Sequence, residues 1–362
     1  MTVDDLSAYV ISGRVVSHLP DGVPNATAAR TVVQGISDGV EAERLGFANV
    51  FLSERWNLKE SAVVLGAIGA RTERIGLGTG LISPARRHVL HTAAFGATMH
   101  AAFGPRFILG LGRGEHAYLR HEGLRTAGFD ALVDYVRILR RLWAGETVTY
   151  DGPAGSYTDT KLGDVYDGPA PRVWYGTFGF EKAAAAVTTA FDGVLLPPMM
   201  TPQATAAAVD RLHRACKEAG RDPAEVRIAQ CVVTAPDLSD EESRALAHAR
   251  AVTYLQAAEY GVALAKVNGW DFAPVQRLRA TAAELMARRA DEMVDTAFHR
   301  VQLMDLAELV PDEWMDTSCA LGTAAACADK LAQFRAAGAD EVVTYGSTPG
   351  QNAGLIAAWR TR

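Results

Sequence analysis

The chain has 362 residues, of which 49% are hydrophobic and 22% charged, and its formal net charge is −6 at pH 7. This composition is typical of a globular protein with enough apolar residues to fill a large core. Basic residues form no long run, which disfavours nucleic-acid binding, because that function depends on clustered cations opposite phosphates. No segment approaches the ~20 apolar residues of a membrane helix, and the N-terminal MTVDDLSAYV predicts no signal peptide. We therefore expect a soluble, cytoplasmic protein with no membrane or nucleic-acid partner.

Short apolar segments alternate with longer amphipathic ones along most of the chain. In chain order, strands are predicted at Tyr9–Val16, Phe47–Leu52, Arg74–Thr79, Phe107–Leu111, Val173–Tyr175, Gly193–Leu196, Glu225–Thr234 and Glu341–Tyr345. Helices are predicted between them at Ala28–Leu45, Ala62–Ala70, Val89–Phe103, Phe129–Trp143, Glu181–Ala190, Pro202–Glu218 and Thr323–Ala336. Such alternation implies a parallel sheet. Eight units favour an α/β fold of the (β/α)8 TIM-barrel type, and an open doubly wound sheet is the alternative.

Two stretches do not follow this alternation. Residues 145–171 are rich in Gly, Asp, Tyr and Thr and predict a long excursion after a helix. Residues 237–315 are charged and helical, and predict a helical insertion before the last strand that caps a pocket. The chain 1–362 is thus predicted to be one barrel domain with two insertions.

The four cysteines, at 216, 231, 319 and 327, form neither a C-x-x-C pair nor a zinc-like spacing. They are predicted to be free thiols, and we expect no metal site.

The segment FILGLGRGEH, Phe107 to His116, joins an apolar strand to three glycines, a carboxylate and an imidazole. Its G-x-G-x-G spacing in the fourth unit does not fit the dinucleotide fingerprint, which has G-x-G-x-x-G in the first unit. Gly110 and Gly112 are instead predicted to make room inside a barrel, where a flat ring can lie against the strand end. Glu115 then projects into an active site, because the carboxyl ends of the strands build the site in barrel enzymes.

Three other strand ends carry polar or glycine-rich sequences. The second strand runs into Ser53-Glu54-Arg55-Trp56, and the third into a glycine-rich turn followed by Arg86, Arg87 and His88. That basic cluster is either a solvated surface or a contact for an anion. The fifth unit, from Tyr175 to Lys182, places a glycine turn before a helix N-terminus, which is typical of an anion site.

Together, three segments resemble the luciferase-like family of barrel enzymes that use flavin or the deazaflavin coenzyme F420. The segments are RIGLGTGLISPARRH followed by GPRFILGLGRGE, then RILRRLWAGETVTYDG, and then WYGTFGFEKAAAAVTTAFDGVLL. The chain looks more like the F420-dependent branch, because Ser53–Arg55 stands where F420-dependent sugar-phosphate dehydrogenases have Ser-Asp-His. The resemblance implies an F420-dependent oxidoreductase that transfers a hydride between the deazaflavin C5 and a small molecule, and it suggests a homodimer.

The resemblance also implies roles for individual residues. Glu115 matches the catalytic glutamate of the family, and the Gly80–Leu81 bond matches a non-prolyl cis peptide behind the deazaflavin ring. The cofactor would be lined by Glu54, Thr79, Gly80, Leu81, Ser83, Arg113 and Tyr118, with its phosphate at Gly179 and Phe180. We expect Glu115 to transfer the proton, with His116 as the next candidate.

The chain departs from that pattern in two places. Arg55 replaces a histidine proposed for proton transfer; a guanidinium stays protonated, so Arg55 would pin an anion or stabilise developing charge instead. The lysine expected after the sixth strand to hold a sugar phosphate is replaced by Leu196-Pro-Pro-Met-Met. This sequence predicts an apolar pocket wall of Met199 and Met200, with Trp56 nearby, and hence a substrate that is not a sugar phosphate.

Three other functions remain open at this stage, and so does the direction of hydride transfer. The first is an FMN-dependent luciferase-like monooxygenase that consumes oxygen. The second is a protein that binds F420 or flavin without catalysis. The third is a phosphate-binding barrel lyase or isomerase such as an aldolase, which would need a strand-end lysine, whereas Lys161 and Lys182 are predicted in a loop and at a helix start.

Overall fold

The computed structural model describes residues 3–12, 31–54, 59–286, 298 and 300–362. Within these residues, parallel strands pair in the order β11-β1-β2-β3-β4-β7-β8-β9, and β9 pairs back onto β11, which closes the barrel. The barrel strands are β1 (Leu6–Val10), β2 (Asn49–Leu52), β3 (Gly76–Thr79), β4 (Phe107–Leu111), β7 (Arg172–Gly176), β8 (Gly193–Leu196), β9 (Arg227–Pro236) and β11 (Glu341–Tyr345). The predicted (β/α)8 barrel is confirmed, and the open doubly wound sheet is wrong.

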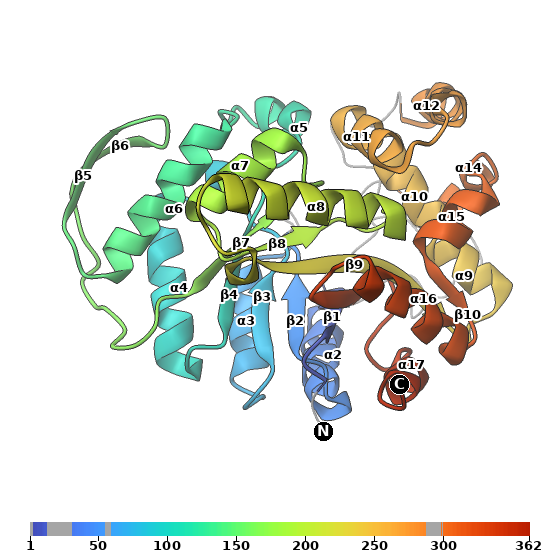
Figure 1. Cartoon of the computed structure of the whole chain (residues 1–362), viewed down its shortest axis with the longest axis horizontal. Coiled ribbons are helices and arrows are strands. Elements are labelled where there is room, and N and C mark those ends of the chain that lie inside the picture. Colours follow the sequence, from blue (N-terminus) through green and yellow to red (C-terminus); the bar gives the residue numbers. More distant parts are fainter. Residues whose placement is uncertain (1–2, 13–30, 55–58, 287–297, 299) are drawn as a thin grey trace.

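Helices surround the strands as the alternation predicts (Figure 1). Around the barrel lie α2 (Val32–Leu45), α3 (Ser61–Gly69), α4 (Val89–Phe103), α6 (Phe129–Trp143), α7 (Glu181–Ala190), α8 (Pro202–Glu218), α16 (Ala324–Ala336) and the C-terminal α17 (Ala353–Trp359). Short helical segments are α5 (His116–His121) and the 3-10 turns Pro84–Arg86, Pro223–Glu225 and Arg300–Leu303. None of the described helices is both long and apolar enough to cross a bilayer.

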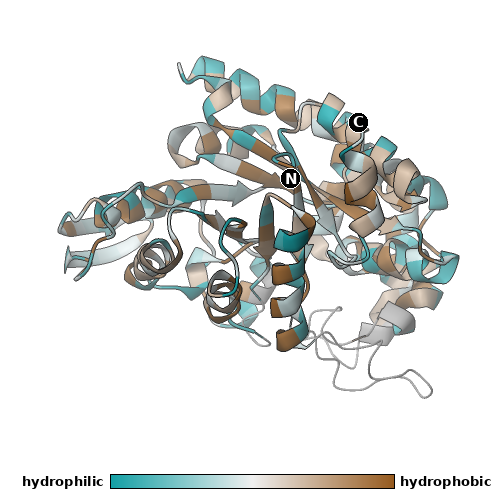
Figure 2. Cartoon of the chain, turned by 90° about the horizontal axis from the view of Figure 1, so that it is seen from below, coloured by the Kyte–Doolittle hydropathy of each residue, from teal (hydrophilic) through white to brown (hydrophobic). Residues whose placement is uncertain are grey.

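Residues of each strand alternate between two hydrophobic cores. Phe51 and Trp174 face the barrel interior, where their ring centroids are 5.5 Å apart. Their neighbours Leu52 and Val173 pack outward against the helices. Figure 2 shows largely apolar strands in the interior and, around them, helices that carry both apolar and polar residues. Burial on both faces explains why the strands appear in the sequence as short continuous apolar runs.

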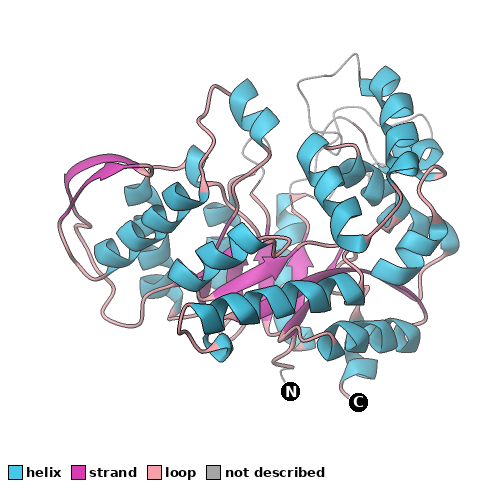
Figure 3. Ribbon diagram, turned by 45° about the horizontal axis from the view of Figure 1, so that its top comes forward, coloured by secondary structure: helices cyan, strands magenta, loops and turns pink. Residues whose placement is uncertain are grey.

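The first of the two predicted excursions contains an antiparallel hairpin, which the sequence analysis missed. Its strands are β5 (Val148–Gly152) and β6 (Gly155–Thr160), with Tyr150 opposite Tyr157. The hairpin projects away from the barrel beyond α6 (Figures 1 and 3). Most of its side chains are exposed, so it lacks the apolar alternation that identifies a strand.

The second excursion is helical, as predicted. It comprises α9 (Asp240–Leu246), α10 (His248–Leu255), α11 (Ala258–Asn268), α12 (Phe272–Met286), α14 (Met304–Ala307) and α15 (Asp312–Ser318). Its members are tied together by a hydrogen bond of 2.8 Å between His248 Nε2 and Asp312 Oδ1 and by the stacked rings of Trp270 and Trp314, 4.4 Å apart. A short strand that was not predicted, β10 (Ala320–Gly322), follows the insertion and pairs with the end of β9.

The first barrel strand was predicted too far along the chain. Strand β1 spans Leu6–Val10, not Tyr9–Val16, because Leu6–Ala8 pair with Val342–Thr344 of β11. This pairing joins the two ends of the barrel and is a tertiary contact, which a local pattern cannot reveal. Residues 13–16 of the predicted strand lie outside the described residues.

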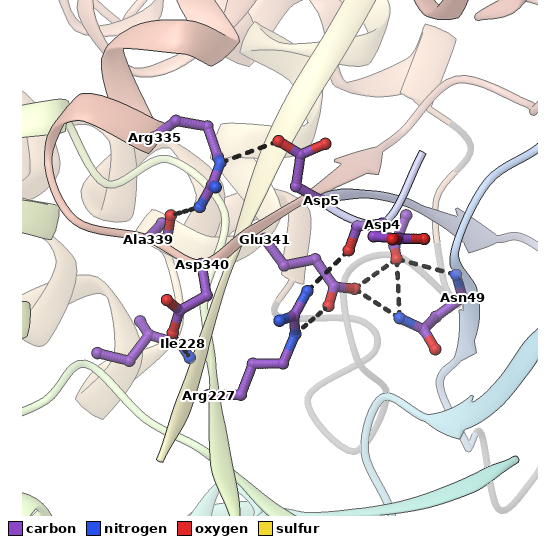
Figure 4. A network of polar contacts seen from close by, with 10 residues as sticks. Asp4, Asp5, Asn49, Arg227, Ile228, Arg335, Ala339, Asp340 and Glu341 are labelled. Atoms are coloured by element: carbon purple, nitrogen blue, oxygen red, sulfur yellow. Dashed lines mark hydrogen bonds and ion pairs between the residues drawn. The ribbon is translucent and has the colours of Figure 1, made fainter. Parts of the chain in front are cut away.

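A buried polar network closes the amino end of the barrel (Figure 4). Glu341 begins β11 and is fully buried. Its carboxylate accepts hydrogen bonds from Arg227 Nε at 2.9 Å, from Asn49 Nδ2 at 2.8 Å and from the hydroxyl of Ser7. These residues lie at the starts of four strands, at the end of the barrel opposite the one where barrel enzymes have their active sites. We therefore assign them a role in stabilising the fold.

Candidate active site at the carboxyl end of the barrel

A backbone bulge follows β3 at the carboxyl end of the barrel. The peptide bond between Gly80 and Leu81 is cis, as the resemblance implies. The side chain of Thr79 holds the bulge to β4, because its hydroxyl is 2.8 Å from both the backbone nitrogen and the backbone oxygen of Gly110. On the other side, Gly80 donates to the carbonyl of Leu52 at 2.8 Å. The bulge is therefore anchored to both neighbouring strands.

Glycines on two adjacent strands make room for this bulge. A Cβ on Gly110 would lie 2.0 Å from the carbonyl oxygen of Thr79, and one on Gly176 would lie 1.9 Å from Leu81 Cδ1. A Cβ on Gly112 would also meet Leu81 Cδ1, at 2.8 Å. The glycines at 110 and 112 thus make room at the strand end, and the space is taken first by the bulge and by the side chain of Leu81.

Glu54, at the end of β2, is held in an ion pair. Its buried carboxylate contacts the guanidinium of Arg87, which also pairs with Glu60. Arg86 pairs with Glu122 through two contacts of 2.8 Å. Both arginines of the basic cluster are therefore matched with acids of the chain. The other two residues predicted near Glu54, Arg55 and Trp56, lie outside the described residues.

Two buried polar atoms near the bulge have no hydrogen-bond partner among the described residues, namely Ser83 Oγ and Arg113 Nε. The guanidinium of Arg113 lies over the ring of Phe129, 4.6 Å from its centroid. It is also close to Tyr175, where burial raises the pKa of the phenol to about 12 although Arg113 lowers it. Buried donors are normally satisfied, so Ser83 and Arg113 fit an anionic or polar ligand at this end of the barrel. Tyr118 lies in α5, but its side chain is not among those described.

The turn before α7 has the features of an anion site. Gly179 has a φ of 69°, and a Cβ there would lie 2.9 Å from Ala208 Cβ, so the position requires glycine. Phe180 precedes the helix and provides no side-chain cap. Arg211 reaches this turn and donates to the carbonyl of Gly179 at 2.7 Å, while Lys266 Nζ lies 5.6 Å from the ring centroid of Phe180. A helix N-terminus flanked by two cations favours a phosphate.

Glu115 lies in the loop shortly after the end of β4 and against the helical insertion. Its Oε1 accepts a hydrogen bond of 3.1 Å from the backbone amide of Glu259, in the first turn of α11. Burial raises the pKa of Glu115 above its ordinary value, and the charge of Glu259 raises it further, whereas the amides of Glu259 and Tyr260 and the ring of His116 lower it. A carboxyl group with a raised pKa is suited to proton transfer near neutral pH.

Both ring nitrogens of His116 have partners. Nε2 is 2.8 Å from Arg113 Nη2, and Nδ1 is 3.3 Å from Glu259 Oε1. Because arginine only donates, Nε2 accepts and the ring proton lies on Nδ1, directed at Glu259. His116 thus links the charged side chains of Arg113 and Glu259.

The two methionines predicted to line the pocket point in different directions. Both are fully buried, but Met199 packs with the barrel interior and Met200 with the helices outside it. Asn268 at the end of α11 holds this loop, since its amide donates to the carbonyl of Met199 at 2.8 Å and accepts from the amide of Thr201 at 2.9 Å. Only Met199 is placed as a candidate for the inner wall.

Aromatic residues that the sequence analysis missed gather over the barrel mouth. Tyr9 and Tyr345 meet edge to face at 4.7 Å, and the hydroxyl of Tyr345 is 2.7 Å from that of Tyr254 in α10. Tyr260 of α11 stacks on Tyr254 at 4.9 Å, and burial raises the pKa of both phenols. Arg250 donates to Tyr345 at 3.2 Å. These residues are far apart in the sequence and follow no local motif, so only the fold brings them together.

Comparison with known proteins agrees with this geometry. The sequence model of the luciferase-like monooxygenases matches residues 23–341, which is most of the chain. The chain belongs to the luciferase-like monooxygenase family. The barrel strands from β2 to β9, with the glycine-rich ends of β3 and β4, lie within the matched region.

Similar proteins of this family include F420-dependent enzymes. The chain is 36% identical over 148 residues to an F420-dependent glucose-6-phosphate dehydrogenase of Microbacterium testaceum, which covers 37% of this chain and 43% of that protein. It is 32% identical over 193 residues to a 5,10-methylenetetrahydromethanopterin reductase of Methanolobus tindarius, covering 52% and 57%. The matches span about half the length of these curated relatives.

Solved structures share the fold over the whole chain. The coenzyme F420-dependent tetrahydromethanopterin reductase from Methanopyrus kandleri aligns with a TM-score of 0.77 at 18% identity, covering 98% of this chain and 97% of that one. The monooxygenase RslO1 from Streptomyces bottropensis aligns with a TM-score of 0.63 at 19% identity, covering 98% of each chain. At these identities the likeness establishes the barrel and does not choose between cofactors.

Proposed function

We propose that this protein is an F420-dependent oxidoreductase acting on a small organic substrate that is not a sugar phosphate. The observation that carries the proposal is that the ends of two adjacent strands, β3 and β4, each contribute a feature of the candidate site. The anchored bulge after β3 and the half-buried carboxyl group of Glu115 after β4 border the same end of the barrel. The F420-dependent relatives described above support the choice of cofactor.

The donors of this site fit that cofactor. The phosphate would bind at the N-terminus of α7 beside Gly179 and Phe180, with Arg211 and Lys266 supplying positive charge. Ser83 Oγ and Arg113 Nε would find partners on its polar edges. When bound, the deazaflavin supplies a C5 that accepts or donates a hydride.

The residues of the chain then provide orientation, exclusion of water and proton transfer. The Leu81 bulge forms one wall of the site, and the tyrosines of α10 and α11 lie over the barrel mouth. Glu115 gives a proton to the substrate oxygen in reduction, or takes one from it in oxidation. Met199 and the buried aromatic rings make the surroundings largely apolar, which favours a less polar substrate than a sugar phosphate.

The proposal is tested by titrating the purified protein with F420 and, separately, with FMN while following cofactor fluorescence. We expect saturation with F420 in the micromolar range and no saturation with FMN. Preference for FMN would replace the proposal by an FMN-dependent monooxygenase, which oxygen consumption would then measure. Binding of neither would remove the cofactor assignment. Sedimentation of the same preparation tests the proposed homodimer, whose mass would be near twice 38.7 kDa.

A further inference from the structure

The N-terminus of α11 lacks a cap of its own. Ala257 occupies the N-cap position and has no side chain that can accept a hydrogen bond from the first turn. The amide of Glu259 instead donates to the carboxylate of Glu115, which is 144 residues earlier in the chain. The candidate catalytic carboxyl group therefore takes the place of the N-cap side chain of an insertion helix.

The side chain of the same residue makes a second link to the candidate catalytic segment. Glu259 Oε1 lies 3.3 Å from His116 Nδ1, and the other ring nitrogen of His116 lies 2.8 Å from Arg113 Nη2. Glu259 thus contacts the segment Arg113–His116 at two points, through its backbone and through its carboxylate. Figure 1 shows α5 and α11 at the same end of the molecule, opposite the chain termini.

The start of α11 is also held from the opposite side. Arg279 of α12 donates to the carbonyls of Leu255 at 3.0 Å, Ala257 at 2.6 Å and Ala258 at 3.2 Å. Because the helix start is bound to α12 in this way, the amide of Glu259 is presented to Glu115 in a defined direction. A group held on both sides is pre-organised, which is what an acid or base needs for proton transfer.

We propose that Glu259 is a positioning residue for Glu115, so that helix α11 of the insertion completes the candidate active site. Its backbone amide holds the carboxylate of Glu115, and its side chain holds His116 against Arg113. This inference rests on the proposed function for its catalytic consequence, whereas the contacts themselves do not depend on it.

The backbone contact is tested by hydrogen exchange of the cofactor-free protein. In Glu115→Ala the amide of Glu259 loses its acceptor and should exchange on the order of tenfold faster, while in Glu115→Gln the side-chain oxygen still accepts and exchange should stay near that of the wild type. Equal exchange in all three proteins would overturn the inference. This measurement needs no F420, so its outcome is independent of the outcome of the cofactor titration.

The side-chain contact is tested by turnover of the F420-loaded enzyme. Glu259→Ala removes the acceptor for His116 and should lower kcat on the order of tenfold, with the Kd for F420 nearly unchanged. Glu259→Gln keeps an acceptor and should retain kcat within a few-fold. Glu308→Gln, an exposed position of the same insertion, is the matched control. Unchanged kcat in Glu259→Ala would contradict the positioning role.

The pH profile separates positioning from mere structural support. The ionisable groups that act on Glu115 are His116 beside it, Glu259 of α11 and Arg279 of α12, whereas Tyr260 acts only through its backbone amide. Glu259→Gln removes the only negative charge in this set, so the limb of the profile that belongs to Glu115 should move to lower pH, whichever direction the reaction runs. A profile that coincides with that of the wild type would overturn the inference.

Discussion

Glu115 combines the position and the ionisation behaviour expected of a proton-transferring group. It lies shortly after the end of β4, and burial raises its pKa, so that its protonated form persists to higher pH than that of an exposed glutamate. If Glu115 acts as an acid, activity is present below this raised pKa and is lost as the pH rises through it. If Glu115 acts as a base, the dependence is reversed.

Replacing Glu115 by glutamine should lower kcat by ~10²-fold or more, because the amide keeps the hydrogen bond to Glu259 but cannot transfer a proton. The Kd for F420 should remain near that of the wild type. Steady-state kinetics across the neutral pH range measures kcat, and the fluorescence titration measures the Kd for F420. The limb of the pH profile assigned to Glu115 should vanish in the variant. Turnover equal to that of the wild type would remove Glu115 from the mechanism.

At the scale of the element, the bulge after β3 depends on the strands beside it. Gly110 and Gly176 lie at the ends of β4 and β7 and leave the space that the bulge occupies. The neighbours differ in kind, because Gly110 faces the carbonyl of Thr79 and Gly176 faces the terminal methyl of Leu81. Backbone cannot move aside as a side-chain tip can, so the two positions tolerate substitution unequally.

We therefore expect Gly110→Ala to destabilise the protein by about 3 kcal/mol, near the upper end of the usual cost of overpacking. Gly176→Ala should lower the free energy of unfolding by less than Gly110→Ala does. Adding Leu81→Ala to the Gly176→Ala chain should restore part of that loss, because it removes the methyl group that the new Cβ would meet. Gly66→Ala on α3, where nothing lies within 4 Å, is the control and should be neutral or stabilising. Urea unfolding measures all four proteins, and equal stability of Gly110→Ala and Gly66→Ala would refute this account.

At the scale of the whole molecule, the two ends of the barrel have different tasks. The carboxyl end carries the unsatisfied donors, the glycines and the proposed acid. The amino end carries Glu341, buried with Arg227, Asn49 and Ser7 as donors to its carboxylate (Figure 4). Because β1 and β11 meet there, this network joins the beginning of the chain to its end.

Arg227→Met leaves the carboxylate of Glu341 buried without its cationic partner, so we expect a loss of about 3 kcal/mol of stability. This loss is at the lower end of the usual range for breaking a buried ion pair, because Arg227 is itself 36% exposed. Arg141→Met, which removes the exposed pair with Glu146, should cost no more than about 1 kcal/mol. Denaturant unfolding gives both values, and kcat should be unaffected in each. Similar stabilities would show that the network at Glu341 contributes little.

Much of this protein could be predicted from local sequence. Helices such as Phe129–Trp143 and strands such as Phe107–Leu111 were predicted to the residue, because their apolar spacing and their glycine boundaries are local signals. The exposed hairpin Val148–Thr160 was missed, since none of its strands has a buried face to produce alternation. The first strand was misplaced because its bounds depend on pairing with β11.

The same division holds for the candidate site. The sequence by itself favoured the barrel over an open sheet and placed Thr79, Gly80 and Glu115 at or shortly after strand ends, because strand ends follow from short-range patterns and all parallel strands present their carboxyl ends on one side. Only the tertiary structure decided that Leu81 fills the space beside the glycines, that Met199 and Met200 face opposite cores, and that Glu259 meets Glu115 across 144 residues. Such contacts depend on how an insertion folds back over the barrel, and no local pattern in the chain encodes that path.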